Sequence, residues 1–207
     1  MEISLPQFSE LHFDEDKHLY TLDQNGVTFE LPSVTQILRF ISREIYGDVP
    51  QSVLDKAADK GTRVHEAIEA YDNYGWKECE PDTLPYILAY EKWVQDHNFQ
   101  TAANEYPIYH RTRLYAGKLD RLFLEEGNLS LVDFKTSETI LEPLVAAQLY
   151  GYSEALKSHG IQVKNHYILH LRHDASYDFI KVDIKDGFKI FETCAFLHGV
   201  VKKGGSA

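Results

Sequence analysis

Asp120, Asp133 and Lys135 are the residues whose types and spacing could do chemistry. Asp133 and Lys135 are two residues apart, so in a β-strand both side chains leave the same face and Phe134 points to the other. Carboxylate oxygens suit Mg²⁺ or Mn²⁺, and a neighbouring amine can orient or deprotonate a water molecule. Such a patch could hydrolyse a phosphodiester. The alternative is an ordinary polar end of a strand.

A β-hairpin would bring Asp120 to the same patch. Two apolar-rich segments, Leu114–Glu125 and Leu129–Lys135, flank a predicted turn at residues 126–127. A two-residue turn sets the register and places Asp120 opposite Asp133. Facing carboxylates repel each other, and a bound cation would turn that repulsion into a binding site.

A helix is predicted upstream of this hairpin. The pattern of Gln51–Tyr74 is helical, and we expect an interruption at Gly61, with Thr62 capping a second segment. His65 would then lie in the first turn of that segment. A lone histidine at the border of an apolar stripe is more often a satisfied edge of the core than a ligand.

A second helix is predicted downstream of the hairpin. Pro143 suits its first turn, and the helix would run from Leu144 to Lys157. Gln148 and Tyr152 are four residues apart and therefore share one face. By periodicity alone, Tyr152 would be a core residue and Gln148 a boundary residue.

The N-terminal region predicts a short hairpin followed by a helix start. Leu19–Leu22 and Val27–Leu31 flank the turn signal Asn25-Gly26. Ser33 and Gln36 have the spacing of a capping box.

The order of these elements resembles the PD-(D/E)XK nuclease superfamily, in its RecB-like, phage lambda-exonuclease-like branch. The resemblance covers roughly residues 61 to 152 and is carried by the motifs Gly61-Thr62-Arg63-Val64-His65, Asp120, Asp133-Phe134-Lys135-Thr136 and Gln148-Leu149-Tyr150-Gly151-Tyr152. It implies an α/β fold in which a mixed central β-sheet is flanked by α-helices, as in the restriction-endonuclease-like core.

The resemblance also implies a role for each residue. The expected catalytic residues are Asp120, Asp133 and Lys135. The expected ligands of Mg²⁺ or Mn²⁺ are His65, Asp120, Asp133 and the carbonyl of Phe134. The expected substrate-binding or supporting residues are Glu105, Arg121, Thr136, Gln148 and Tyr152. For Glu105, a solvated strand position is an equal alternative.

These roles describe a metal-dependent DNA nuclease, an exonuclease in recombination, repair, or phage or mobile-element DNA processing. Its partners would be DNA and a recombination protein. One alternative is an inactive nuclease fold that binds DNA or a partner protein, and another is an RNA substrate. Exonuclease polarity and oligomeric state are left open.

Length and composition set further bounds. The 207 residues predict one domain, with an N-terminal hairpin and helix (1–50), a catalytic core (51–200) and a flexible tail (201–207). Two cysteines are too few for a four-thiolate cluster, and no phosphate-loop motif is present. His166 and His170 do not predict a shared zinc site, because a strand separates residues i and i+4 by about 13 Å.

Charge and hydropathy bear on partners and location. The net charge of −11 argues against a protein that coats DNA. A local cationic groove could still form from the cluster His110, Arg111, Arg113, Lys118 and Arg121, or these residues could be a solvated strand edge. The sequence has no membrane-length apolar run and no signal pattern, so we expect a cytoplasmic location and no membrane association.

Overall fold

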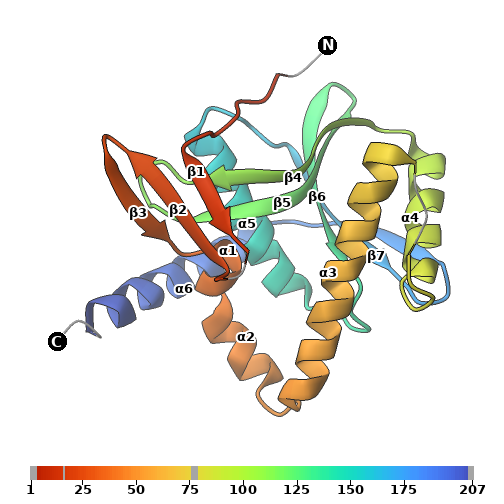
Figure 1. The fold of residues 1–207 in the computed structure, drawn as a ribbon, viewed down its shortest axis with the longest axis horizontal. Coiled ribbons are helices and arrows are strands. Elements are labelled where there is room, and N and C mark those ends of the chain that lie inside the picture. The colour runs from red at the N-terminus through yellow and green to blue at the C-terminus, as the bar shows by residue number, and fades with distance from the viewer. Residues whose placement is uncertain (1–3, 16, 76–78, 205–207) are drawn as a thin grey trace.

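The computed structural model describes residues 4–15, 17–75 and 79–204, and it shows two sheets surrounded by six helices within those ranges (Figure 1). The strands are β1 (Leu11–Asp14), β2 (Leu19–Gln24), β3 (Val27–Leu31), β4 (Gln100–Tyr109), β5 (Ala116–Glu125), β6 (Asn128–Lys135), β7 (Asn165–Leu171) and β8 (Tyr177–Lys181). The helices are α1 (Val34–Ile37), α2 (Arg39–Tyr46), α3 (Gln51–Tyr74), α4 (Leu84–His97), α5 (Glu142–Ser158) and α6 (Lys185–Gly204).

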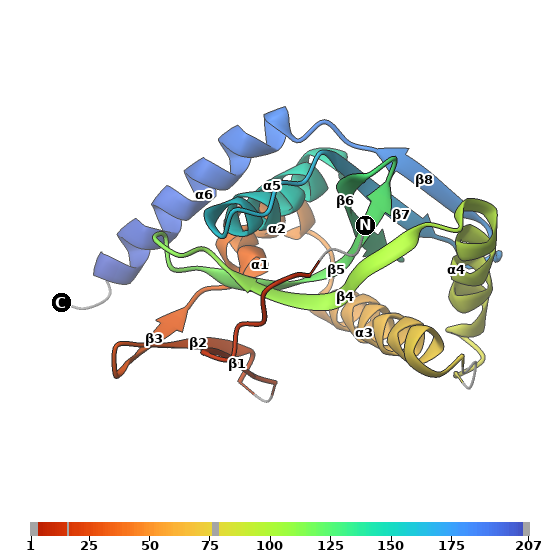
Figure 2. The same cartoon turned by 90° about the horizontal axis from the view of Figure 1, so that it is seen from above.

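The central sheet has the strand order β4-β5-β6-β7-β8. Only β6 and β7 pair in parallel, through the crossover helix α5, so the sheet is mixed. Helices α5 and α6 cover one face and α3 and α4 cover the other (Figure 2). Each face buries its own apolar cluster, and the predicted α/β class with a helix-flanked mixed sheet is confirmed.

The central hairpin has the register that the sequence predicts. Leu122 pairs with Leu131, and the ladder ends at the pair Arg121 and Val132. Glu126 and Gly127 both have positive φ, 49° and 76°, as the two central residues of a type I′ turn require. Because the turn is local, it sets which residues of the two strands pair with each other.

Helix α3 differs from its prediction, because it runs without a break from Gln51 to Tyr74. Thr62 is not a cap; its hydroxyl donates backwards to the carbonyl of Ala58, as threonines inside helices do. A glycine inside a helix costs only about 1 kcal/mol, and burial of Val64 and Ile68 against α4 and the sheet exceeds that cost.

The small sheet β1-β2-β3 is attached to the ends of β4 and β5. Its predicted turn and the predicted capping box between Ser33 and Gln36 are both present. The backbone N–H of Ala116 donates to the carbonyl of Pro32 over 2.9 Å, and Tyr20 and Leu31 pack with Ala116. This sheet therefore has a fixed position beside the central hairpin.

Helix α6 extends to Gly204, past the start of the predicted tail at 201; residues 205–207 lie outside the described residues. None of the described helices combines the length and apolar character needed to cross a membrane.

The histidines of β7 have separate partners. His166 lies 2.7 Å from the hydroxyl of Ser153 on α5, and Nε2 of His170 lies 2.8 Å from the carbonyl oxygen of Ser137. Neither histidine belongs to the three-ligand cluster found in the described part of the chain.

His166 predicts a loss of stability in mild acid. Burial lowers its pKa from 6.5 to about 4, so between these values the unfolded chain binds a proton that the folded protein excludes. Stability should fall as the pH drops from 6.5 to 4, by up to about 3 kcal/mol from this residue. Urea unfolding at several pH values should show that the free energy of unfolding falls less in acid for His166→Asn than for the wild type. The matched control is His173→Asn, since His173 is exposed, and it should keep the slope of the wild type.

Candidate active site

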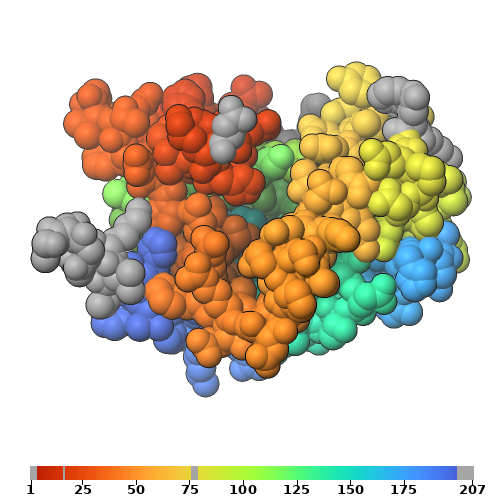
Figure 3. Space-filling model, turned by 60° about the horizontal axis from the view of Figure 1, so that its bottom comes forward, coloured from red at the N-terminus to blue at the C-terminus, as the bar shows by residue number. Residues whose placement is uncertain are grey.

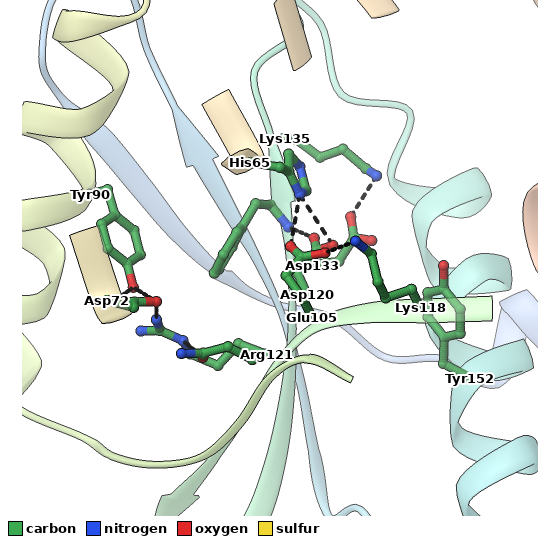
Figure 4. Close-up of polar contacts among 12 residues, drawn as sticks. His65, Asp72, Tyr90, Glu105, Lys118, Asp120, Arg121, Asp133, Lys135 and Tyr152 are labelled. Carbon is green, nitrogen blue, oxygen red and sulfur yellow. Dashed lines mark hydrogen bonds and ion pairs between the residues drawn. The ribbon is translucent and has the colours of Figure 1, made fainter. Parts of the chain in front are cut away.

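One group of potential ligands comes from three different elements. His65 of α3, Glu105 of β4 and Asp120 of β5 each offer a ligand atom, and these atoms lie within 4.8 Å of one another. Nδ1 of His65 is 3.4 Å from Oε1 of Glu105 and 3.4 Å from Oδ1 of Asp120 (Figure 4). An imidazole nitrogen and two carboxylates form a donor set that fits Mn²⁺ or Mg²⁺.

Strand register explains how two of these carboxylates meet. Asn104 pairs with Arg121 and Tyr106 pairs with Leu119, so Glu105 lies opposite Asp120 across β4 and β5. The hairpin register continued by one position places Asp133 of β6 on the other side of Asp120. Three carboxylates therefore form a row across three neighbouring strands.

Asp120 is held by the backbone of β6. Its Oδ2 accepts the N–H of Phe134 over 2.5 Å, at the point where the regular ladder ends. Burial raises the pKa of Asp120 to about 7, and the nearby charges of Asp133 and Glu105 add to the increase. The row of carboxylates is thus costly to ionise without a cation.

His65 acts as a cation in this arrangement. Burial lowers its pKa, but the carboxylates of Asp120 and Glu105 raise it by more, to about 9. A divalent ion bound by the same carboxylates would compete with the proton of His65.

Asp133 and Lys135 form an ion pair at the end of β6. Nζ of Lys135 lies 2.6 Å from Oδ2 of Asp133, and that aspartate is 2% exposed. Nζ also donates to Oε1 of Gln148 on α5 over 3.1 Å. Burial lowers the pKa of Lys135, but the carboxylates of Asp133 and Asp120 raise it above its ordinary value. The lysine is therefore an ammonium group aimed at the row of carboxylates.

Two of the expected site residues have partners of different kinds. Glu105, expected as a substrate-binding or supporting residue, lies with His65 and Asp120 as a potential ligand, whereas Asp133, an expected ligand, lies outside that group and pairs with Lys135. Lys118, also from β5, holds Glu105 from the solvent side with Nζ 2.8 Å from Oε2. The sequence signal for Glu105 was the family resemblance, because the pairing of β4 with β5 is visible only in the structure.

Arg121 does not face the site, which corrects its expected role in binding substrate. It is 4% exposed and pairs with Asp72 of α3 on the opposite face of the sheet. Its guanidinium also lies over the ring of Phe134, 5.8 Å from the ring centre. Strand alternation accounts for this result, because Arg121 follows the site residue Asp120 and must point to the other face.

The predicted cationic cluster around β5 is neutralised. Arg113 pairs with Glu192, Lys118 pairs with Glu105, and His110 is buried. Arg111, which follows β4, is the exposed member of the cluster without an acidic partner among the described residues. This cluster does not form the expected groove.

Tyr152 packs beside the site, and Thr136 lies next to α3. Tyr152 is 5% exposed and packs on Gly117, where a Cβ atom would lie 2.6 Å from the tyrosine ring. Its hydroxyl is 3.5 Å from Nε2 of Gln148. Thr136 is half-buried next to α3, with its hydroxyl oxygen 3.8 Å from the Cβ position of Gly61. Tyr152 thus braces β5 and Gln148 and is not open to substrate.

The surface is hollowed beside elements that carry the site. The space-filling view shows this hollow between the N-terminal sheet with α2 on one side and α3 on the other, with parts of the central sheet at its bottom (Figure 3). His65 and Lys135 keep 28% and 26% of their side-chain surface exposed, so both can be reached from outside.

Comparisons with known proteins give weak similarities only. No family model matches the chain, and no curated protein matches it. Among solved structures, one described as SSO0001 aligns with 15% identity and a TM-score of 0.36, over 78% of this chain and 84% of that one. An alkaline exonuclease, LHK-Exo, from Laribacter hongkongensis aligns with 12% identity and a TM-score of 0.35, over 69% of this chain and 83% of that one.

Proposed function

We propose that this protein is a metal-dependent exonuclease that hydrolyses phosphodiester bonds in DNA. The observation that supports it most is the row of Glu105, Asp120 and Asp133, flanked by His65 and by the ammonium group of Lys135. Acidic residues, a histidine and a lysine at one accessible point match the PD-(D/E)XK order that the sequence resembles. Such DNA cleavage would serve recombination, repair or phage DNA processing.

Each residue has a part in this proposal. His65, Glu105 and Asp120 would hold Mg²⁺ or Mn²⁺, with Asp133 and the Phe134 carbonyl next to them. When bound, the ion supplies positive charge for the phosphate and lowers the pKa of water. Lys135 stays protonated beside Asp133, so it orients the attacking water or stabilises the phosphate by donating hydrogen bonds. Gln148 holds the ammonium group in place.

The test uses two DNA substrates and three metal conditions. Linear duplex and covalently closed circular duplex are incubated with Mg²⁺, Mn²⁺ or EDTA, alongside the double variant Asp120→Asn, Asp133→Asn. Metal-dependent loss of the linear DNA alone, absent in the variant, is the expected result. Nicking of the circular duplex would show that the protein is an endonuclease and not an exonuclease. If neither DNA is cut, the nuclease proposal fails and an inactive binding fold takes its place.

Asp120→Asn should stabilise the metal-free protein and remove its response to metal. The amide can still accept the N–H of Phe134, while the charge next to Asp133 and Glu105 is lost. At pH 8 in EDTA we expect a gain of at least about 1 kcal/mol. The gain should vanish towards pH 4, where the wild-type carboxyl is protonated as well.

Thermal unfolding with and without Mg²⁺ checks this expectation. The wild type should rise in Tm with the ion and the variant should not. Asp133→Asn is the matched comparison, and it should lower stability, because Lys135 loses its buried partner. Equal destabilisation by both changes would contradict the repulsion along the row.

A further inference from the structure

Two arginines of α2 lie on one face of that helix. Arg39, Arg43 and Tyr46 recur at the positions i, i+4 and i+7, which share a face. Ile41 points to the opposite side, where it packs against the main apolar cluster. With Ile41 as its anchor, α2 presents the arginines away from the core.

The Tyr46 end of α2 is joined by residues 47–50 to α3, the helix that carries His65 (Figure 1). Helix α2 forms part of the wall of the hollow across from α3 (Figure 3). Arg39 and Arg43 are about 6 Å apart along the helix axis and extend the row that begins at Tyr46.

Both arginines lack an acidic partner among the residues that the structure describes, and both are exposed. The two lysines at the site itself are paired, Lys118 with Glu105 and Lys135 with Asp133. Across the hollow, the single arginine Arg63 of α3 is surrounded by three acidic groups, Asp59, Glu80 and Asp82. In a chain with a net charge of −11, α2 therefore offers two exposed arginines against a single acidic residue of its own, Glu44.

We propose that Arg39 and Arg43 bind the phosphate backbone of the DNA that enters the site, which guides the strand along α2 to Lys135. This inference rests on the proposed nuclease function. Guanidinium groups match phosphate oxygens in geometry and remain charged at all relevant pH values. Two such contacts on one helix face hold two phosphates without reading the bases, so the contribution to affinity is independent of sequence.

Salt dependence of DNA binding tests the assignment. A fluorescent duplex of about 20 base pairs is titrated with protein in EDTA, which prevents cleavage, between roughly 50 and 200 mM salt. Arg39→Gln with Arg43→Gln should reduce the slope of log affinity against log salt by about two. Arg39→Lys with Arg43→Lys should keep most of the slope, because the charges remain. Lys164→Gln with Lys189→Gln removes two other exposed and unpaired cations and should leave the slope unchanged.

The outcomes separate this inference from the nuclease proposal. If the glutamine variant binds with the wild-type slope and an unchanged Tm, the arginines do not contact phosphate and the inference is overturned. If the slope falls as expected while the wild type never cuts DNA with metal, the binding surface stands and the nuclease proposal fails. If the Lys164→Gln, Lys189→Gln variant lowers the slope as much as the Arg39→Gln, Arg43→Gln variant does, DNA binds diffusely over the surface and the assignment to α2 is wrong.

Discussion

Lys135→Ala should abolish DNA cleavage, with a loss in rate of about 10³-fold or more, while the binding of divalent metal persists. The ammonium group of Lys135 is the cation that β6 contributes next to the row of carboxylates, and Gln148 fixes its position. The metal would be held by His65, Glu105 and Asp120, none of which needs the lysine for its position. Single-turnover cleavage and a Mn²⁺ titration measure the two effects separately.

A variant that fails to fold would give the same loss of rate, so two comparisons are needed. Lys135→Met fills the same volume without the charge and should be as inactive as the alanine variant. Lys157→Ala removes a lysine of α5 that forms only an exposed ion pair with Glu154, and it should leave cleavage unchanged. Turnover by Lys135→Met at the wild-type rate would remove the lysine from the mechanism.

Gly187→Ala should destabilise the protein strongly, by about 2 kcal/mol or more. A Cβ atom on Gly187 of α6 would lie 2.3 Å from the carbonyl oxygen of Ala146 and 2.6 Å from the backbone nitrogen of Ala147 on α5. These are backbone atoms, so no side chain can swing aside and one helix must move. Chemical unfolding should show the loss, and displacement of α5 should also reduce cleavage, since α5 carries Gln148.

The matched control is on the same helix. Gly199→Ala meets no atom within 4 Å, so it should raise stability slightly through the higher helix propensity of alanine. The pair thus separates helix propensity from helix packing. Equal effects of the two substitutions would show that α5 and α6 do not approach as closely as the structure indicates.

Local sequence patterns determined several features of this protein. The two-residue turn at Glu126-Gly127 set the hairpin register and, through it, the placement of Asp120 next to Asp133. Helical spacing placed Gln148 and Tyr152 on one face, and the structure keeps them in contact. These features depend on neighbours within a few residues, for which periodicity and turn chemistry are sufficient.

Other features were decided only by tertiary structure. Glu105 joins Asp120 because β4 pairs with β5, a choice made by packing over the whole sheet. The continuity of α3 came from burial against α4, which exceeds the local cost of Gly61. The pairing of Arg121 with Asp72 joins residues that lie 49 positions apart in the sequence. Sequence by itself therefore determined which face each reactive side chain takes along its own element. The tertiary structure decided which elements meet, because burial and charge pairing between distant segments leave no local signal.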